Sequence, residues 1–172
     1  MLFRSQIPKI LSDALAVSFD NSVGHDYLQD SDDRFEFYHR TEERIPFDLD
    51  YFNKITKGGL PNKTLNIALA GTGVGKSLFM CHCAAGAMVQ GKNVLYLTME
   101  MSEEKIAERI DANLLNVTLD DLIELPKDIY DKKVTKVREK TTGKLIIKEY
   151  PTASASVIHF RTLLNEIGRA HV

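Results

Sequence analysis

A glycine-rich turn between an apolar run and a helical pattern constrains this chain more than any other feature of its sequence. The apolar run Leu65–Leu69 is followed directly by Ala70-Gly71-Thr72-Gly73-Val74-Gly75-Lys76-Ser77. A strand that ends at such a turn and passes into a helix leaves consecutive backbone N–H groups unpaired and directed at one point. Glycine permits positive φ angles and a close approach of the main chain to an anion, and the following helix adds the positive end of its dipole. The pattern therefore predicts a phosphate-binding loop.

Each part of this loop has a predicted role in binding a nucleotide. Main-chain N–H groups around the phosphates are expected from Gly71, Thr72, Gly73, Val74 and Gly75, with the glycines at positive φ. Lys76 is expected to reach the β- and γ-phosphates, and the Ser77 hydroxyl to fill one coordination position on Mg²⁺. The usual pattern begins with glycine where this chain has Ala70. The alternative interpretation is an ordinary glycine-rich turn between a strand and a helix.

Composition and charge indicate one soluble globular domain. The chain has 172 residues, of which 44% are hydrophobic, and a formal net charge of −2. It contains no apolar run long enough to span a bilayer, and Met1–Ser5 does not open a long apolar signal segment. We therefore expect a cytoplasmic protein without a membrane partner. Cys81 and Cys83 fall on one predicted helix with diverging side chains, so we expect reduced core thiols, and neither a disulfide nor a metal site.

The first part of the chain is predicted to be helical and without strands. Apolar residues in Ser5–Phe19 follow the spacing of one helical face, and Ser31 is expected to cap a second short helix through Phe35 and Tyr38. Two interpretations stay open. This section is an arm that needs something else to pack against, or its first helix folds back on its own domain.

From Ile45 onward the pattern alternates between strands and helices. Helices are predicted over residues 48–55, 76–90, 102–113 and 126–140, with a short helix from the capping box at Thr118 and a last helix after Pro151 to about Glu166. A turn is predicted over residues 58–62, and strands over 64–70, 93–99 and 144–149. The second strand is apolar on both faces, as buried parallel strands are. This alternation predicts an α/β fold with a parallel, doubly wound sheet whose ligand lies at the carboxyl ends of the strands. Three strands make an incomplete sheet of this kind.

A carboxylate is predicted at the same edge of the sheet as the phosphate-binding loop. The second strand ends at Thr98-Met99-Glu100-Met101, which brings Glu100 to the carboxyl ends of the strands. Such a group can orient and deprotonate a water that attacks the γ-phosphate, while Lys76 neutralises charge on the phosphoryl oxygens. We therefore take Glu100 and Lys76 as the catalytic candidates. The alternative is that Glu100 only belongs to the helix start at Ser102.

Several segments together resemble the ATPase domain of DnaB-type replicative helicases, and above all the hexameric replicative helicases of large tailed phages. The matching stretch runs from Leu65 to Val117, and residues 49–59 and 150–153 extend it. Within it the likeness lies at residues 70–77, 91–96, 99–104 and 109–113. The resemblance is most specific at Met99-Glu100-Met101-Ser102. It implies a RecA-like P-loop fold for residues 46–166, preceded by a helical linker over residues 1–45.

The resemblance also implies an activity and partners. Glu100 would activate water, and hydrolysis of ATP with Mg²⁺ would drive movement along single-stranded DNA and duplex unwinding. Ser5–Phe19 would be the linker helix by which each subunit holds its neighbour in a hexameric ring, with a primase or loader proteins as further partners. Such helicases also need an apolar strand that ends in Asp, and no strand of this kind occurs here. We therefore expect the chain by itself to be an inactive fragment.

Other interpretations stay open. One is a recombinase-like or clock-protein-like ATPase of the same fold that does not unwind DNA, and another is a small-molecule P-loop kinase. A separate prediction concerns residues 167–172, Ile-Gly-Arg-Ala-His-Val, which are compatible with an in-frame translation of a common sequencing adapter. We interpret this tail as a sequencing artefact.

Overall fold

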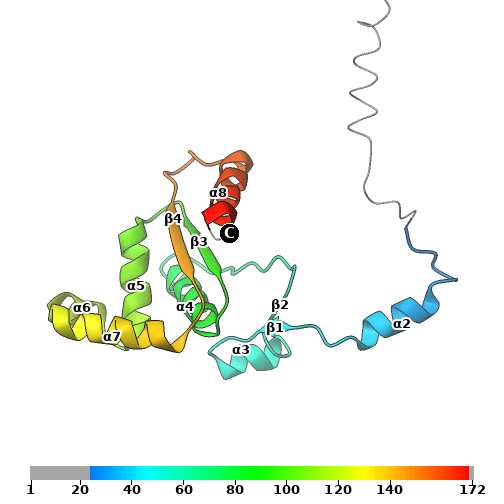
Figure 1. Cartoon of the computed structure of the whole chain (residues 1–172), viewed down its shortest axis with the longest axis horizontal. Helices are drawn as coiled ribbons and strands as arrows, with labels where there is room; N and C mark the ends of the chain where they lie inside the picture. The colour runs from blue at the N-terminus through cyan, green and yellow to red at the C-terminus, as the bar shows by residue number, and fades with distance from the viewer. Residues whose placement is uncertain (1–23, 171–172) are drawn as a thin grey trace, which may run out of the picture. The chain divides into compact units, whose positions relative to one another are not determined.

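The computed structural model describes residues 24–170, which fall into two units that divide after Thr41. The second unit contains both sheets and all but one of the described helices (Figure 1). The predicted helix Ser5–Phe19 lies outside the described residues.

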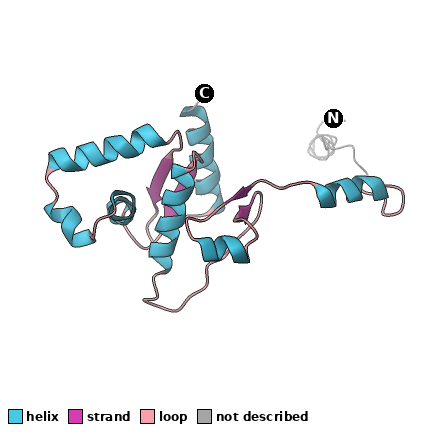
Figure 2. Cartoon of the chain, turned by 90° about the horizontal axis from the view of Figure 1, so that it is seen from below, coloured by secondary structure: helices cyan, strands magenta, loops and turns pink. Residues whose placement is uncertain are grey.

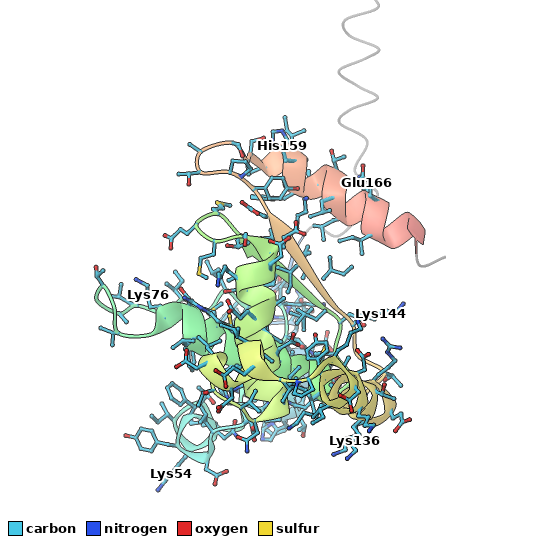
Figure 3. All side chains as sticks on the ribbon, turned by 90° about the vertical axis from the view of Figure 1, so that its left-hand side faces the viewer. Lys54, Lys76, Lys136, Lys144, His159 and Glu166 are labelled. Carbon is cyan, nitrogen blue, oxygen red and sulfur yellow. The ribbon has the colours of Figure 1, made fainter. Side chains whose placement is uncertain are left out.

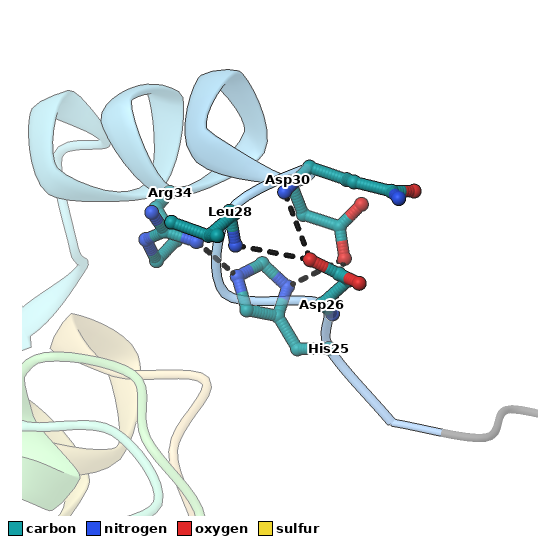
Figure 4. Close-up of polar contacts among 6 residues, drawn as sticks. His25, Asp26, Leu28, Asp30 and Arg34 are labelled. Atoms are coloured by element: carbon teal, nitrogen blue, oxygen red, sulfur yellow. Dashed lines mark hydrogen bonds and ion pairs between the residues drawn. The ribbon is translucent and has the colours of Figure 1, made fainter.

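The described part of the first unit consists of a polar turn and helix α2 (Ser31–His39). In the turn, Asp26 Oδ1 accepts hydrogen bonds from two following N–H groups at 3.0 and 2.9 Å, and His25 pairs with Asp30 at 3.2 Å (Figure 4). The N-cap position is Asp30, without a side-chain cap bond, so the prediction that Ser31 caps this helix is wrong. No residue of α2 is buried, and local polar contacts rather than an apolar core hold this segment.

The second unit alternates helices with four short strands. Its elements are β1 (Arg44–Ile45), α3 (Asp50–Ile55), β2 (Leu60–Pro61), α4 (Lys76–Val89), β3 (Val94–Thr98), α5 (Glu103–Leu115), α6 (Leu119–Glu124), α7 (Lys127–Lys140), β4 (Leu145–Glu149) and α8 (Val157–Ala170). Strand β3 pairs in parallel with β4, from Val94 opposite Leu145 to Thr98 opposite Glu149. The predicted α/β class and the parallel pairing of these two strands are therefore confirmed.

The core lies between the β3–β4 pair and the helices α4 and α5 (Figure 1). Its buried members are Cys81, Ala85, Ile106 and Ile110, with Tyr96, Leu145 and Ile147 packed against them from the strands. Burial raises the pKa of the Cys81 thiol and raises the pKa of Tyr96 to about 12. Both cysteines are free, as predicted, and residues 24–170 contain no cluster of His, Cys, Asp or Glu that could hold a metal ion. The prediction that β3 is buried on both faces is wrong, because only Thr98 in that strand is fully buried.

Local sequence signals account for the starts of α5 and α6 and for the end of α4. Ser102 Oγ accepts the N–H of Lys105 at 3.3 Å at the start of α5, and Thr118 and Asp121 form the predicted capping box of α6. Gly91, at φ 81°, follows the end of α4 as predicted, and its N–H donates to Met88 O at 2.9 Å. Helix α8 continues to Ala170, beyond the predicted end. Within residues 24–170, no helix is long and apolar enough to cross a membrane.

The predicted strand over residues 64–70 is not a strand in the structure. The segment runs as a loop between β2 and α4 (Figure 2), and its alternating apolar side chains, Leu65, Ile67 and Leu69, are 87%, 80% and 95% exposed. A strand forms only where a neighbour supplies hydrogen-bond partners for its backbone. In the described part of the chain β3 pairs with β4, and no strand pairs with this segment. The expected three-stranded parallel sheet is therefore a two-stranded one.

A second small sheet was not predicted. Strands β1 and β2 pair antiparallel, with Arg44 opposite Pro61 and Ile45 opposite Leu60. The predicted turn over residues 58–62 therefore contains a strand in its middle. Gly59 is buried beside this sheet, with φ at +119°, and a Cβ atom there would lie 2.1 Å from Ile45 O. Only glycine fits this position without displacing the backbone of β1.

Replacing Gly59 with alanine is expected to lower the free energy of unfolding by about 3 kcal/mol or more, because the methyl group meets rigid backbone in a strained conformation. Gly58→Ala is the matched control. Gly58 also has a positive φ of +109°, but its Cβ would approach only Arg44 Cδ, at 3.7 Å. In the control, the free energy of unfolding should fall by about 1 kcal/mol. Denaturant unfolding of the two variants measures both values, and equal losses would show that the clash with Ile45 is not the cause.

Candidate functional site

The predicted phosphate-binding loop is a turn whose backbone amides stay unpaired. Gly73 and Gly75 have φ angles of 75° and 98°. The N–H groups from Gly73 to Ser77 donate no hydrogen bond within the described part of the chain, and the first backbone bond into α4 runs from Phe79 N to Gly75 O at 2.9 Å. Consecutive free amides at a left-handed turn form a concave anion-binding surface.

Only two of the three loop glycines have the predicted conformation. Gly71 is not at positive φ, and a Cβ atom there would make an ordinary contact with Val74 Cγ2 at 3.6 Å. At Gly73 and Gly75 a Cβ atom would meet nothing within 4 Å. The requirement for glycine at these two positions is therefore conformational, and the space beside them is open.

Lys76 bends back across the loop. It is the first residue of α4, as Figure 3 shows, and its Nζ donates to Ala70 O at 3.2 Å. The ammonium group therefore connects the two ends of the turn. The acceptor is a backbone carbonyl, so alanine at position 70 provides it as well as the usual glycine would. The next residue, Ser77, is half-buried in the first turn of α4.

The start of α4 differs electrostatically from the starts of the two capped helices, α5 and α6. Helices α5 and α6 begin with a side-chain cap and acidic residues in the first turn. Helix α4 has neither a side-chain cap nor an acidic residue in its first turn. The positive end of its dipole is therefore not neutralised by the helix itself, and Lys76 adds a full charge, which together favour a bound anion.

A cleft of about 520 Å³ opens beside the loop and is lined largely by apolar side chains. Gly75 and Lys76 line it together with the exposed segment before the loop and three aromatic rings, Phe47, Phe52 and Phe79. The ring centroids lie 5.5, 6.1 and 5.2 Å apart in the pairs 47–52, 47–79 and 52–79. Sequence reasoning missed this cluster, because its members belong to separate elements and carry no shared spacing.

Asn53 fixes one side of this cleft. Its side-chain amide accepts from Phe47 N and donates to Phe47 O, each at 2.7 Å. These two hydrogen bonds hold α3 against the segment after β1. Phe47 is thereby held against Phe52 and against Phe79 of α4.

Glu100 lies in the bend after the carboxyl end of β3, and its side chain is exposed. Within the described residues it forms no hydrogen bond or ion pair with the loop, and it is not among the residues that line the cleft. The structure therefore brings the loop residues and Lys76 together. Glu100 lies at the predicted strand end and forms no hydrogen bond or ion pair with them within the described residues.

The alternative interpretation was that Glu100 only belongs to the start of the helix at Ser102. In the structure, the residues that follow Glu100 form that helix start. Ser102 caps α5, and Glu103 Oε1 accepts from Glu149 N at 3.0 Å and from Lys148 Nζ at 3.3 Å. Both hydrogen bonds lower the pKa of Glu103, and the one from the Glu149 backbone has the larger effect. Glu103 therefore ties the start of α5 to β4, and the carboxylate of Glu100 is not used to start the helix.

Two comparisons with known proteins show which family the chain is similar to. Residues 45–169 match the family model described as the DnaB-like helicase C terminal domain. Over 164 residues, 94% of this chain, the sequence is 49% identical to a protein of Enterobacteria phage T4 named DnaB-like replicative helicase. The chain spans about a third of that relative, 34% of its length. The chain belongs to the family of DnaB-like helicase C-terminal domains.

Proposed function

We propose that this chain carries the ATP-binding and ATP-hydrolysing site of a replicative DNA helicase. The observation that carries the proposal is the row of unpaired amides from Gly73 to Ser77, with Lys76 bent across it, in a chain of this helicase family.

The loop supplies the groups that bind the triphosphate. The main chain of Gly71, Thr72, Gly73, Val74 and Gly75 surrounds the phosphates, and Lys76 exchanges its bond to Ala70 O for the β- and γ-phosphate oxygens. That exchange replaces a neutral acceptor by a charged one, so it favours the bound state.

Ser77 is suited to the metal that accompanies ATP. Mg²⁺ prefers hard oxygen ligands and in nucleotide sites takes most of them from phosphates and water. One hydroxyl in the first turn of α4, that of Ser77, fits this mode. When bound, Mg²⁺ neutralises charge on the phosphoryl oxygens. The Ser77 hydroxyl, in the first turn of α4, would hold the ion.

Hydrolysis needs a base for the attacking water, and Glu100 is the proposed one. Its carboxylate is exposed at a strand end and is not bound by the groups that start α5. It accepts the proton of the water while Lys76 stabilises the charge that develops on the γ-phosphoryl oxygens. In this proposal Glu100 acts on the water, and Lys76 acts on the phosphoryl oxygens.

The partners follow from the family. Single-stranded DNA is the proposed track along which ATP hydrolysis moves the protein, and the similar phage T4 protein is named a replicative helicase. We propose assembly into a hexameric ring in which the segment Ser5–Phe19 contacts the neighbouring subunit. A primase or loader protein is a further expected partner.

Forked DNA tests this function in the full-length protein that carries this sequence. ATP-dependent separation of the strands, with ATP turnover stimulated by single-stranded DNA, is the expected result. ATP turnover without strand separation would instead assign a non-unwinding ATPase of the same fold. The absence of ATP turnover with DNA present would contradict the proposal altogether.

A further inference from the structure

We propose that Thr98 and Thr152 are positioning residues that hold Glu100 in place for hydrolysis, an inference that rests on the proposed function. Thr98 is the last residue of β3 and is only 6% exposed. Its hydroxyl donates to Met101 O at 2.9 Å and accepts from Met101 N at 3.2 Å. A single side chain therefore closes the turn in which Glu100 lies.

Thr152 holds the same turn from the other side. Its hydroxyl donates to Met99 O at 3.0 Å, and the neighbouring Tyr150 N donates to Thr98 O at 2.9 Å. The ends of β3 and β4 are therefore joined at the turn by side-chain and backbone bonds. Thr152 belongs to the short segment that leads from β4 to α8.

Each of the two peptide groups next to Glu100 is fixed by one threonine. The peptide between Met99 and Glu100 contains the carbonyl that accepts from Thr152, and the peptide between Glu100 and Met101 contains the N–H that donates to Thr98. The backbone of Glu100 is thereby held on both sides while its carboxylate stays exposed. A catalytic base benefits from this arrangement, since the position of its backbone is set before substrate binds.

The strand alone does not require these hydroxyls. Valine has the same shape as threonine and forms strands equally well, so a buried Thr98 is explained by the two bonds that its hydroxyl makes to Met101. Thr152 is exposed, and its hydroxyl is needed neither for packing nor for a helix cap. What the two residues share is the turn that carries Glu100.

The test uses Thr98→Val and Thr152→Val in the full-length protein. Each is expected to lower kcat for ATP about tenfold to hundredfold, because small displacements of a base are costly, while Kd for ATP changes less than about twofold. Thr98→Ser keeps the hydroxyl and should restore kcat. Thr135→Val, an exposed threonine of α7, is the matched control and should behave as wild type.

A further readout separates positioning from folding. In a Glu100→Gln background, Thr98→Val should cause no additional loss of kcat, because the residue acts through Glu100. A purely structural role would instead lower the melting temperature and leave kcat of the folded protein unchanged. Should Thr98→Val destabilise the fold, the exposed Thr152 still provides the measurement.

The outcomes also distinguish this inference from the proposed function. If wild type hydrolyses ATP, Glu100→Gln is slow, and both valine variants have normal kcat, the positioning role is refuted and the function stands. If Glu100→Gln is as fast as wild type, the assignment of Glu100 fails, and the inference fails with it.

Discussion

ATP turnover is expected to fall at least about a thousandfold when Lys76 is replaced by alanine in the full-length protein. The ammonium group is the only side-chain charge that the loop itself presents, and it already bends across the turn to Ala70 O at 3.2 Å. In the proposed site it stabilises the charge that grows on the γ-phosphoryl oxygens, so its removal acts mainly on the transition state. ATP binding should weaken about tenfold to hundredfold, the value of a lost charged hydrogen bond.

Lys136→Ala is the control for this prediction. Lys136 is an exposed lysine of α7, on a different element from the loop (Figure 3), so the variant removes the same charge without touching the site. Its turnover and its Kd for ATP should equal those of wild type. A Lys76→Ala protein with near-normal turnover would show that the loop does not hold the reacting phosphate.

Elements that depend on short-range signals were predictable from the sequence. The start of α5 follows from Ser102 and the capping box of α6 from Thr118, because these side chains bond to amides three residues away. The loop was predictable for the same reason, since a left-handed turn at Gly73 and Gly75 is a local property. The conformation of Gly71 was not predictable. It has no positive φ, so any residue could adopt it, and nothing in the glycine spacing distinguishes Gly71 from Gly73 and Gly75.

Features that depend on distant partners could not be predicted. The apolar alternation at Leu65, Ile67 and Leu69 indicates a strand, but a strand also needs a neighbour, and the described chain supplies none for this segment. The pairing of β1 with β2 was missed because each strand has only two residues and one of them is Pro61.

The role of the threonines around Glu100 was missed for a related reason. Thr98 is recognisable from sequence as a strand end, but the bond from Thr152 to Met99 O joins positions that are distant in the chain. Only the parallel register of β3 with β4 brings these two strand ends together. The sequence thus predicted the candidate base but not what holds it.

Replacing Glu100 with glutamine is expected to separate ATP binding from hydrolysis. The amide has the shape of the carboxylate but cannot accept the proton of the attacking water, so kcat should fall about a hundredfold to ten-thousandfold. Because Glu100 does not line the cleft beside the loop and forms no hydrogen bond or ion pair with the loop within the described residues, Kd for ATP should change less than about threefold. Single-turnover hydrolysis and equilibrium binding of ATP, both with DNA present, measure the two quantities.

Glu104→Gln tests whether this effect belongs to one carboxylate or to the acidic start of α5 as a whole. Glu104 is exposed in the first turn of α5, four positions further along the chain, and its loss removes the same charge. Turnover close to wild type is expected, because the side chain is not at the strand end where the water is proposed to bind. If both variants slow hydrolysis equally, the general negative charge of the segment matters and Glu100 is not a specific base. If Glu100→Gln hydrolyses ATP at the normal rate, the base must come from another residue of the protein or from a neighbouring subunit.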